Sequence, residues 1–162
     1  MNLANSIPVF KLYGESWHWP TPDLLHCESI QSRSSLYDWS IRAHQHTDLV
    51  QILYIQQGQG EIEIEGVRQP FTDACVQVMP ALCVHGFRFS PGTQGYSRSL
   101  AAPLVAKFEQ LFGRPVQVLN RAVRVPVGDA GAQIHTLFQS LQQEYQADND
   151  ARDMMLHSLL SA

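Results

Sequence analysis

Three histidines and one glutamine are the side chains in this sequence whose types and spacing best suit chemistry. His44 and His46 lie two residues apart just before the apolar run 49–55, and His85 follows a later apolar run. Residues two apart in a strand point to the same face, so the first two imidazoles are expected to project together. Gln51 comes five residues after His46. This spacing predicts a cluster that could bind a metal or an anionic ligand.

Two interpretations of this cluster stay open. Three converging imidazoles could hold Zn²⁺, Ni²⁺ or Fe²⁺, with Gln51 or water completing the ligand set. An amide is a poorer metal ligand than a carboxylate, because it does not offset the charge of the cation. Alternatively, His44, His46, Gln51 and His85 line an organic pocket.

The elements that must position these residues change character near residue 100. Before it, short β-type runs alternate with Gly and Pro, a pattern typical of an all-β barrel or a double-sheet jelly roll. After it, apolar spacing becomes helical. The predicted strands cover 7–13, 24–30, 36–42, 49–55, 61–65, 74–79, 84–89 and 96–100, with a loop at 17–22 and a tight turn at 58–60. Helices are predicted over 103–112, from an N-cap at Asp129 to about 145, and over 151–162, with 116–127 extended.

The helix predicted before residue 145 has one continuous apolar face. This face could form a homodimer interface, which we favour, or it could pack on the chain's own barrel. Its residues are Ile134, Leu137, Phe138, Leu141 and Tyr145.

Composition limits the class of protein. The chain has 162 residues, enough for one domain with a core, and its net charge of -4 argues against nucleic-acid binding by this chain alone. The odd number of cysteines, three, and the absence of a leader-like start predict a cytoplasmic protein with reduced thiols. No apolar run reaches the 18 or so residues that a membrane span requires, so no membrane association is expected.

The histidine pattern resembles the two motifs of the cupin family. His44-Gln-His46, four residues, Gln51, six residues and Gly58 follow the first motif, with Gln51 where cupins carry Glu. Pro80 and His85 follow the second motif, although its usual Gly and Asn are Leu82 and Phe89 here. The resemblance implies a cupin jelly-roll barrel.

The whole chain is similar to the N-terminal regulatory domain of AraC-type transcription factors, and most to their para-hydroxybenzoate-responsive branch. The stretches that carry this resemblance are 7–14, 44–54 and the segment around His85, followed by the helical tail. It implies a cupin sensor over 1–101, a dimerisation and linker tail over 102–162, and DNA contact only through a helix-turn-helix domain that this chain does not contain.

A small aromatic acid such as a hydroxybenzoate is therefore the expected effector, with no catalysis and no required cofactor. The apolar slot is predicted from Trp39, Ile52, Tyr54, Phe87 and Phe89, with Arg88 alternating to the outer face. The polar anchors are predicted to be Arg42, His44, His46, Gln51 and His85. One alternative is a small metal-dependent cupin enzyme, a dioxygenase or isomerase; another is a dimerisation module without a ligand.

Overall fold

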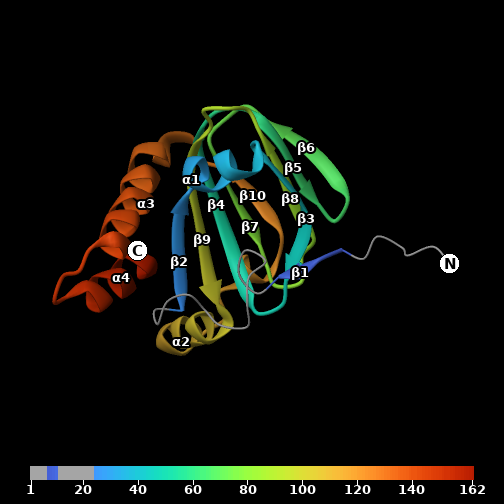
Figure 1. The fold of residues 1–162 in the computed structure, drawn as a ribbon. Coiled ribbons are helices and arrows are strands. Elements are labelled where there is room, and N and C mark those ends of the chain that lie inside the picture. The colour runs from blue at the N-terminus through green and yellow to red at the C-terminus, as the bar shows by residue number, and fades with distance from the viewer. Residues whose placement is uncertain (1–6, 11–23) are drawn as a thin grey trace.

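Two facing β-sheets form the body of the protein. The computed structural model describes residues 7–10 and 24–162, and in this part of the chain each sheet has five strands (Figure 1). One sheet has the order β1-β3-β8-β5-β6, and the other has the order β10-β7-β4-β9-β2. The pairs are antiparallel except β1 with β3. The strands are β1 Val9–Phe10, β2 Leu25–Ser29, β3 Ser40–His46, β4 Leu49–Gln57, β5 Gly60–Ile64, β6 Val67–Phe71, β7 Cys75–Met79, β8 His85–Phe89, β9 Gln94–Ala101 and β10 Val123–Pro126.

The space between the sheets contains one of two hydrophobic cores. Strand alternation decides which residues enter it, because successive side chains point to opposite faces. On β4, Leu53 and Ile55 point inward and are almost fully buried. They meet inward-facing side chains of the other sheet, chiefly Ile62, Phe87 and Phe89.

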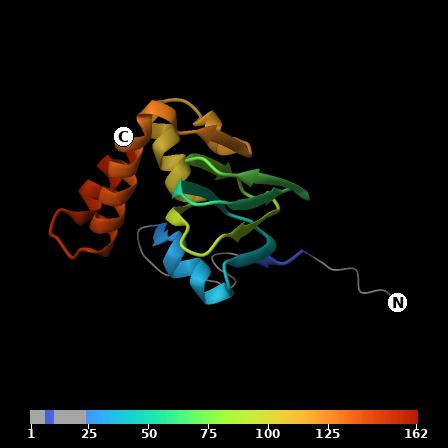
Figure 2. The ribbon, with the colours of Figure 1, turned by 90° about the horizontal axis from the view of Figure 1, so that it is seen from above.

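The second core lies between the outer face of the β4 sheet and the helices. These helices are α2 Ala102–Phe112, α3 Gly131–Gln146 and α4 Arg152–Ser161, whereas α1 Ile30–Ser34 contributes Ile30 to the first core. α3 and α4 lie side by side outside the barrel, and α2 lies at one end of it (Figures 1 and 2). Val50, Leu100 and Leu104 pack there with Leu141 of α3 and Leu156 of α4.

Several predicted elements are confirmed. The helix predicted at 103–112 is α2, which has Pro103 in its first turn and ends at Gly113 with a φ of 65°. The turn predicted at 58–60 connects β4 to β5, and Gly58 has a φ of 121°, a conformation that favours glycine. Arg88 points outward, as predicted, and its Nη1 lies 3.5 Å from Glu61 Oε2.

Other predictions need correction. Asp129 lies in a short 3-10 turn, and α3 begins after Ala130 without a side-chain cap. The strand predicted at 36–42 begins only at Ser40, because a 3-10 turn covers Ser35–Tyr37. Strand β6 was not predicted, since four of its five residues are exposed and give no alternation. It pairs with β5 across a turn at Glu65 and Gly66, both with positive φ.

Part of the N-terminal prediction cannot be followed in the structure. Of the strand predicted at 7–13, only β1 belongs to the described residues, and the loop predicted at 17–22 lies outside them. Within the described chain, no helix combines the length and apolarity that crossing a membrane would require.

Candidate functional site

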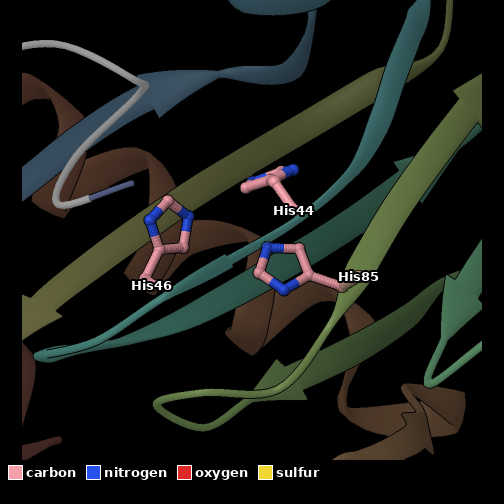
Figure 3. A group of neighbouring side chains, drawn as sticks. All are labelled: His44, His46 and His85. Carbon is pink, nitrogen blue, oxygen red and sulfur yellow. The ribbon is translucent and has the colours of Figure 1, made fainter. Parts of the chain in front are cut away.

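His44, His46 and His85 form a compact cluster inside the barrel (Figure 3). The ligand nitrogens of the three rings all lie within 4.8 Å of one another, and each residue is at most 7% exposed. β3 contributes the first two histidines, and His85 is the direct partner of His44 on β8. The predicted convergence of the three imidazoles is therefore what the strand register produces.

Backbone carbonyls orient two of these rings. His44 Nδ1 lies 2.8 Å from the carbonyl oxygen of Arg42, and His85 Nδ1 lies 2.9 Å from that of Cys83. Because a carbonyl oxygen only accepts, each Nδ1 carries the hydrogen, and each Nε2 of the neutral ring presents a lone pair.

Burial keeps His44 and His85 neutral. Burial, together with the nearby His44 and His46, lowers the pKa of His85 to about 3. The pKa of His44 is also lowered, first by burial and then by the positive charge of Arg33. Neutral imidazole is the form that coordinates a metal, so the donor set, its spacing and its protonation state all fit a divalent ion.

A pocket of about 500 Å³ opens beside this cluster, between the two sheets and α1. It brings together four of the predicted ligand-binding residues, His44, Gln51, Arg42 and Phe87, and also Phe89 of the predicted slot. His44 belongs to both the histidine cluster and the pocket lining, whereas His46 and His85 do not line this pocket.

The pocket also contains Arg33 and Glu28, which the sequence analysis did not single out. With the predicted Arg42, they give the described part of the lining two positive charges and one negative charge, excluding histidine. Ser97 lines it as well and accepts a hydrogen bond from Gln51 Nε2 at 3.2 Å.

Arg33 and Ser34 reach the pocket because α1 interrupts the barrel after β2. The only sequence signal for this helix is Ser29, whose hydroxyl accepts a hydrogen bond from the backbone N–H of Ser32 at 3.0 Å and caps the helix. Five helical residues are too few for a periodic pattern, so α1 and its pocket residues were missed.

Three predicted slot residues lie elsewhere. Tyr54 and Ile52 alternate with Gln51 and Leu53 on β4, and therefore point to the outer face. The ring of Tyr54 lies 4.9 Å from the ring of Phe138 beneath α3. Trp39 packs against the inner core next to the pocket but is not part of its lining. Tyr54 and Ile52 therefore do not line this pocket, because the prediction considered their apolar character without strand parity. Trp39, which precedes β3, does not line it either.

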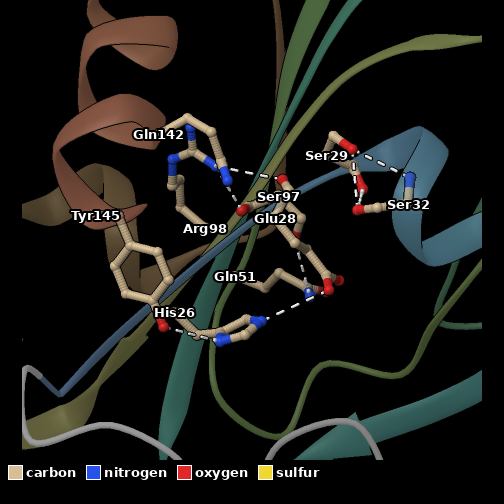
Figure 4. Close-up of polar contacts among 9 residues, drawn as sticks. All are labelled: His26, Glu28, Ser29, Ser32, Gln51, Ser97, Arg98, Gln142 and Tyr145. Atoms are coloured by element: carbon tan, nitrogen blue, oxygen red, sulfur yellow. Dashed lines mark hydrogen bonds and ion pairs between the residues drawn. The ribbon is translucent and has the colours of Figure 1, made fainter. Parts of the chain in front are cut away.

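Arg98 joins the wall of the pocket to α3 (Figure 4). Its guanidinium donates to the carbonyl oxygens of Ser97 at 2.9 Å and Phe138 at 2.6 Å. It also donates to the carbonyl of Glu28 at 3.3 Å and to Gln142 Oε1 at 3.0 Å. Arg98 is 1% exposed, and these bonds explain how a polar strand segment can lie beneath a helix.

A second link reaches α3 through β2. His26 Nε2 lies 3.5 Å from Glu28 Oε2, and His26 Nδ1 lies 3.2 Å from the hydroxyl of Tyr145 (Figure 4). Glu28 lines the pocket, so the pocket and α3 are connected by side-chain contacts as well as by Arg98.

The helix face predicted to form a dimer interface is largely used within the chain. Phe138 packs against the rings of Tyr54 and Tyr96 on the outer face of β4 and β9, Leu141 is buried in the second core, and Tyr145 packs against that core. Ile134 and Leu137 on the same helix are half-buried. Of the two interpretations, packing on the barrel accounts for Phe138, Leu141 and Tyr145.

Comparisons with known proteins find likeness in structure alone. No protein-family model and no curated protein matches the sequence. The chain is similar to an apo variant of ToxT from Vibrio cholerae strain SCE256, with 8% identity, a TM-score of 0.51, and coverage of 85% of this chain and 53% of that one. The chain thus spans about half of the length of that ToxT chain.

Two further solved structures are weaker matches. A predicted oxalate decarboxylase from Thermotoga maritima has 13% identity over 48% of this chain and 80% of that one, with a TM-score of 0.36. A cupin 2 conserved barrel domain protein from Salinispora arenicola CNS-205 has 19% identity over 59% of this chain and 79% of that one, with a TM-score of 0.37.

At these identities the likeness concerns the fold. The ToxT chain shares the general architecture of this one. The fold class predicted from the sequence is therefore confirmed: the chain is a cupin-type jelly-roll barrel followed by C-terminal helices.

Proposed function

We propose that this chain is the effector-binding domain of an AraC-type regulator and that its effector is a small aromatic acid. The observation that carries the proposal is the charge of the pocket. Arg33 and Arg42 both line it, in a chain whose net charge is -4. A positive pocket in an acidic protein favours an anionic ligand, and guanidinium groups suit a carboxylate.

The walls of the pocket suit a flat apolar ring. Phe87 and Phe89 stack with their ring centroids 5.6 Å apart, and Leu53 faces them from the opposite sheet. A pocket with mostly apolar walls and a few polar groups, at about 500 Å³, is the usual kind of site for a small molecule.

The contacts between the pocket and α3 give such a ligand a route to the rest of a regulator. Ser97 and Glu28 line the pocket, and Arg98 and His26 connect them to α3. A ligand that shifts Ser97 or Glu28 changes the free energy with which α3 packs on the barrel. We propose that the output is read by a DNA-binding domain in the cytoplasm, and that Ile134 and Leu137 contribute to a homodimer.

A thermal-shift screen tests the proposed ligand class. Benzoate and hydroxybenzoates should raise the unfolding midpoint, because a ligand at a hundred times its dissociation constant adds about 2.7 kcal/mol to the free energy of unfolding. Aromatic amines of the same size, which are cationic or neutral, serve as controls and should not. No shift with any aromatic acid, with or without chelator, would contradict the proposal.

A bound divalent ion is a second part of the proposal. His44, His46 and His85 would hold it, and the ion would supply a positive charge close to the pocket. Elemental analysis should find about one equivalent in protein loaded with Zn²⁺, Ni²⁺ or Fe²⁺ and then desalted. The variant His85→Ala should lose the ion, and an equal content in wild type and variant would contradict this assignment.

The histidine cluster also supports a second candidate, a metal-dependent enzyme that acts on a phenolic acid. The cluster is one residue short of the usual cupin ligand set, because Gln51 supplies an amide and binds Ser97. We therefore favour the non-catalytic role. Turnover of hydroxybenzoates by protein loaded with Fe²⁺, Mn²⁺ or Ni²⁺ would favour the enzyme instead.

A further inference from the structure

Arg33, one of the two arginines in the pocket lining, lies against an aromatic ring. Its guanidinium carbon Cζ is over the ring of Tyr37, 4.7 Å from the ring centroid, and both side chains line the pocket. A guanidinium that stacks on an aromatic face keeps its in-plane N–H groups available for a carboxylate. The contact with Tyr37 therefore restricts Arg33 without using the donors that an acid would need.

The backbone that follows Tyr37 fixes the position of this ring. Asp38 and Trp39 have positive φ values of 52° and 58°, and strain of this kind in successive non-glycine residues is often found at ligand-binding sites. The N–H of Trp39 donates to the carbonyl oxygen of Ser34 at 2.8 Å, and the N–H of Phe89 donates to the carbonyl oxygen of Trp39 at 2.8 Å. These bonds tie the turn that carries Tyr37 to α1 and β8, which both line the pocket.

We propose that Tyr37 is a positioning residue, whose ring holds the guanidinium of Arg33 in the pocket so that it can bind the acid group of a ligand. This inference rests on the proposed function, because it concerns the same anionic ligand. An arginine loses much side-chain freedom when it binds, and this loss weakens the affinity. A ring that restricts Arg33 before the ligand arrives reduces that cost. The face of the ring is sufficient for this role, and the hydroxyl of Tyr37 has no part in it.

Calorimetric titration of benzoate into two variants of Tyr37 tests the role of the ring. Tyr37→Leu should weaken binding about threefold to tenfold, because Arg33 is then no longer restricted. Tyr37→Phe keeps the face of the ring and should bind like the wild type. Unchanged affinity in Tyr37→Leu would overturn the inference and leave the proposed function intact. A loss in Tyr37→Phe as large as that in Tyr37→Leu would also overturn it, since the hydroxyl would then be responsible.

A double-mutant cycle shows whether Tyr37 acts through Arg33. In the background of Arg33→Gln, which removes the charge, Tyr37→Leu should change the affinity for benzoate by about twofold or less. The full loss in both backgrounds would mean that Tyr37 contacts the ligand itself, and would overturn the inference. Leu36→Ala is the matched control, because Leu36 lies in the same turn, is 76% exposed and is outside the described pocket lining. It should bind benzoate like the wild type.

NMR spectroscopy of the free protein provides a second readout that needs no ligand. The side-chain protons of Arg33 should resonate upfield of their usual range, because they lie over the face of an aromatic ring. They should return to that range in Tyr37→Leu and stay upfield in Tyr37→Phe. No binding of benzoate by the wild type would contradict the proposed function itself. Arg33 resonances that Tyr37→Leu leaves unchanged would overturn this inference independently of any ligand.

Discussion

The two faces of strands β4 and β9 differ in how their buried polar groups are used. On the outer face, Arg98 is almost fully buried and donates hydrogen bonds to carbonyls on both sides of the interface with α3. On the inner face, Gln51 is buried as deeply, yet its Oε1 has no partner among the residues that the structure describes. One face is a closed interface, and the other is the wall of a pocket.

This difference teaches how a structural polar residue can be distinguished from a ligand-binding one. Burial alone does not separate Arg98 from Gln51, because both are at most 5% exposed. The number of hydrogen bonds does: the terminal nitrogens of Arg98 donate four hydrogen bonds that connect β2 and β9 to α3, whereas the described residues give the Gln51 side chain one, to Ser97 on the neighbouring strand.

The largest expected loss of stability comes from removing the hydrogen bonds of Arg98 on the outer face. Arg98→Met keeps much of the volume but removes the donors to Phe138 and Gln142, and should lower the free energy of unfolding by about 2–4 kcal/mol in urea titrations. Arg98→Lys should recover part of this loss, since one ammonium can still reach a carbonyl. A loss below about 1 kcal/mol in Arg98→Met would contradict the role of Arg98 as the link to α3.

The next effect concerns the inner face and depends on pH. The pKa of His85 is about 3 in the folded protein and near 6.5 in the unfolded chain, so the unfolded chain takes up a proton first on acidification. Stability should therefore fall as the pH drops below about 6.5, by about 2 kcal/mol between pH 7 and pH 5 for this group in chelator-treated protein.

His85→Gln cannot titrate and should remove this contribution from the pH profile. His157→Gln on α4 is the matched control and should retain the acid sensitivity of the wild type. Identical profiles for wild type and His85→Gln would show that His85 is not held neutral by burial.

The smallest loss of stability is expected at the contact between Tyr145 and His26, which links the pocket wall to α3. Tyr145→Phe removes one hydrogen bond to His26 and should cost about 0.5–1.5 kcal/mol of the free energy of unfolding. Tyr37→Phe changes an exposed tyrosine and should leave stability unaltered. A loss in Tyr37→Phe as large as that in Tyr145→Phe would remove the support for the contact through His26.

Much of the fold was predictable from the sequence because its signals are local. The β-branched run around Ile52, the turn at Gly58 and the helix that ends at Gly113 each follow from propensity and spacing. The histidine cluster was predictable too, because His44 and His46 share a face by parity. Predicting that His85 lies beside His44 required only the assumption that β8 pairs with β3.

The pocket was less predictable because it depends on contacts between distant segments. Glu28 and Ser97 belong to β2 and β9, whose pairing places residues about 70 positions apart side by side. Arg33 enters the pocket only because the short helix α1 turns it inward. The error at Tyr54 could have been avoided, because its parity relative to Gln51 was available from the sequence.

The most direct test of the proposed pocket is a calorimetric titration of the strongest-binding aromatic acid with three proteins. The wild type should bind it saturably at one site per chain. Arg42→Gln should weaken binding about tenfold or more, because it removes a charged partner of the carboxylate. Arg88→Gln, the same substitution on the outer face of β8, should bind like the wild type. Equal affinities for all three proteins, or no binding by the wild type, would contradict the account.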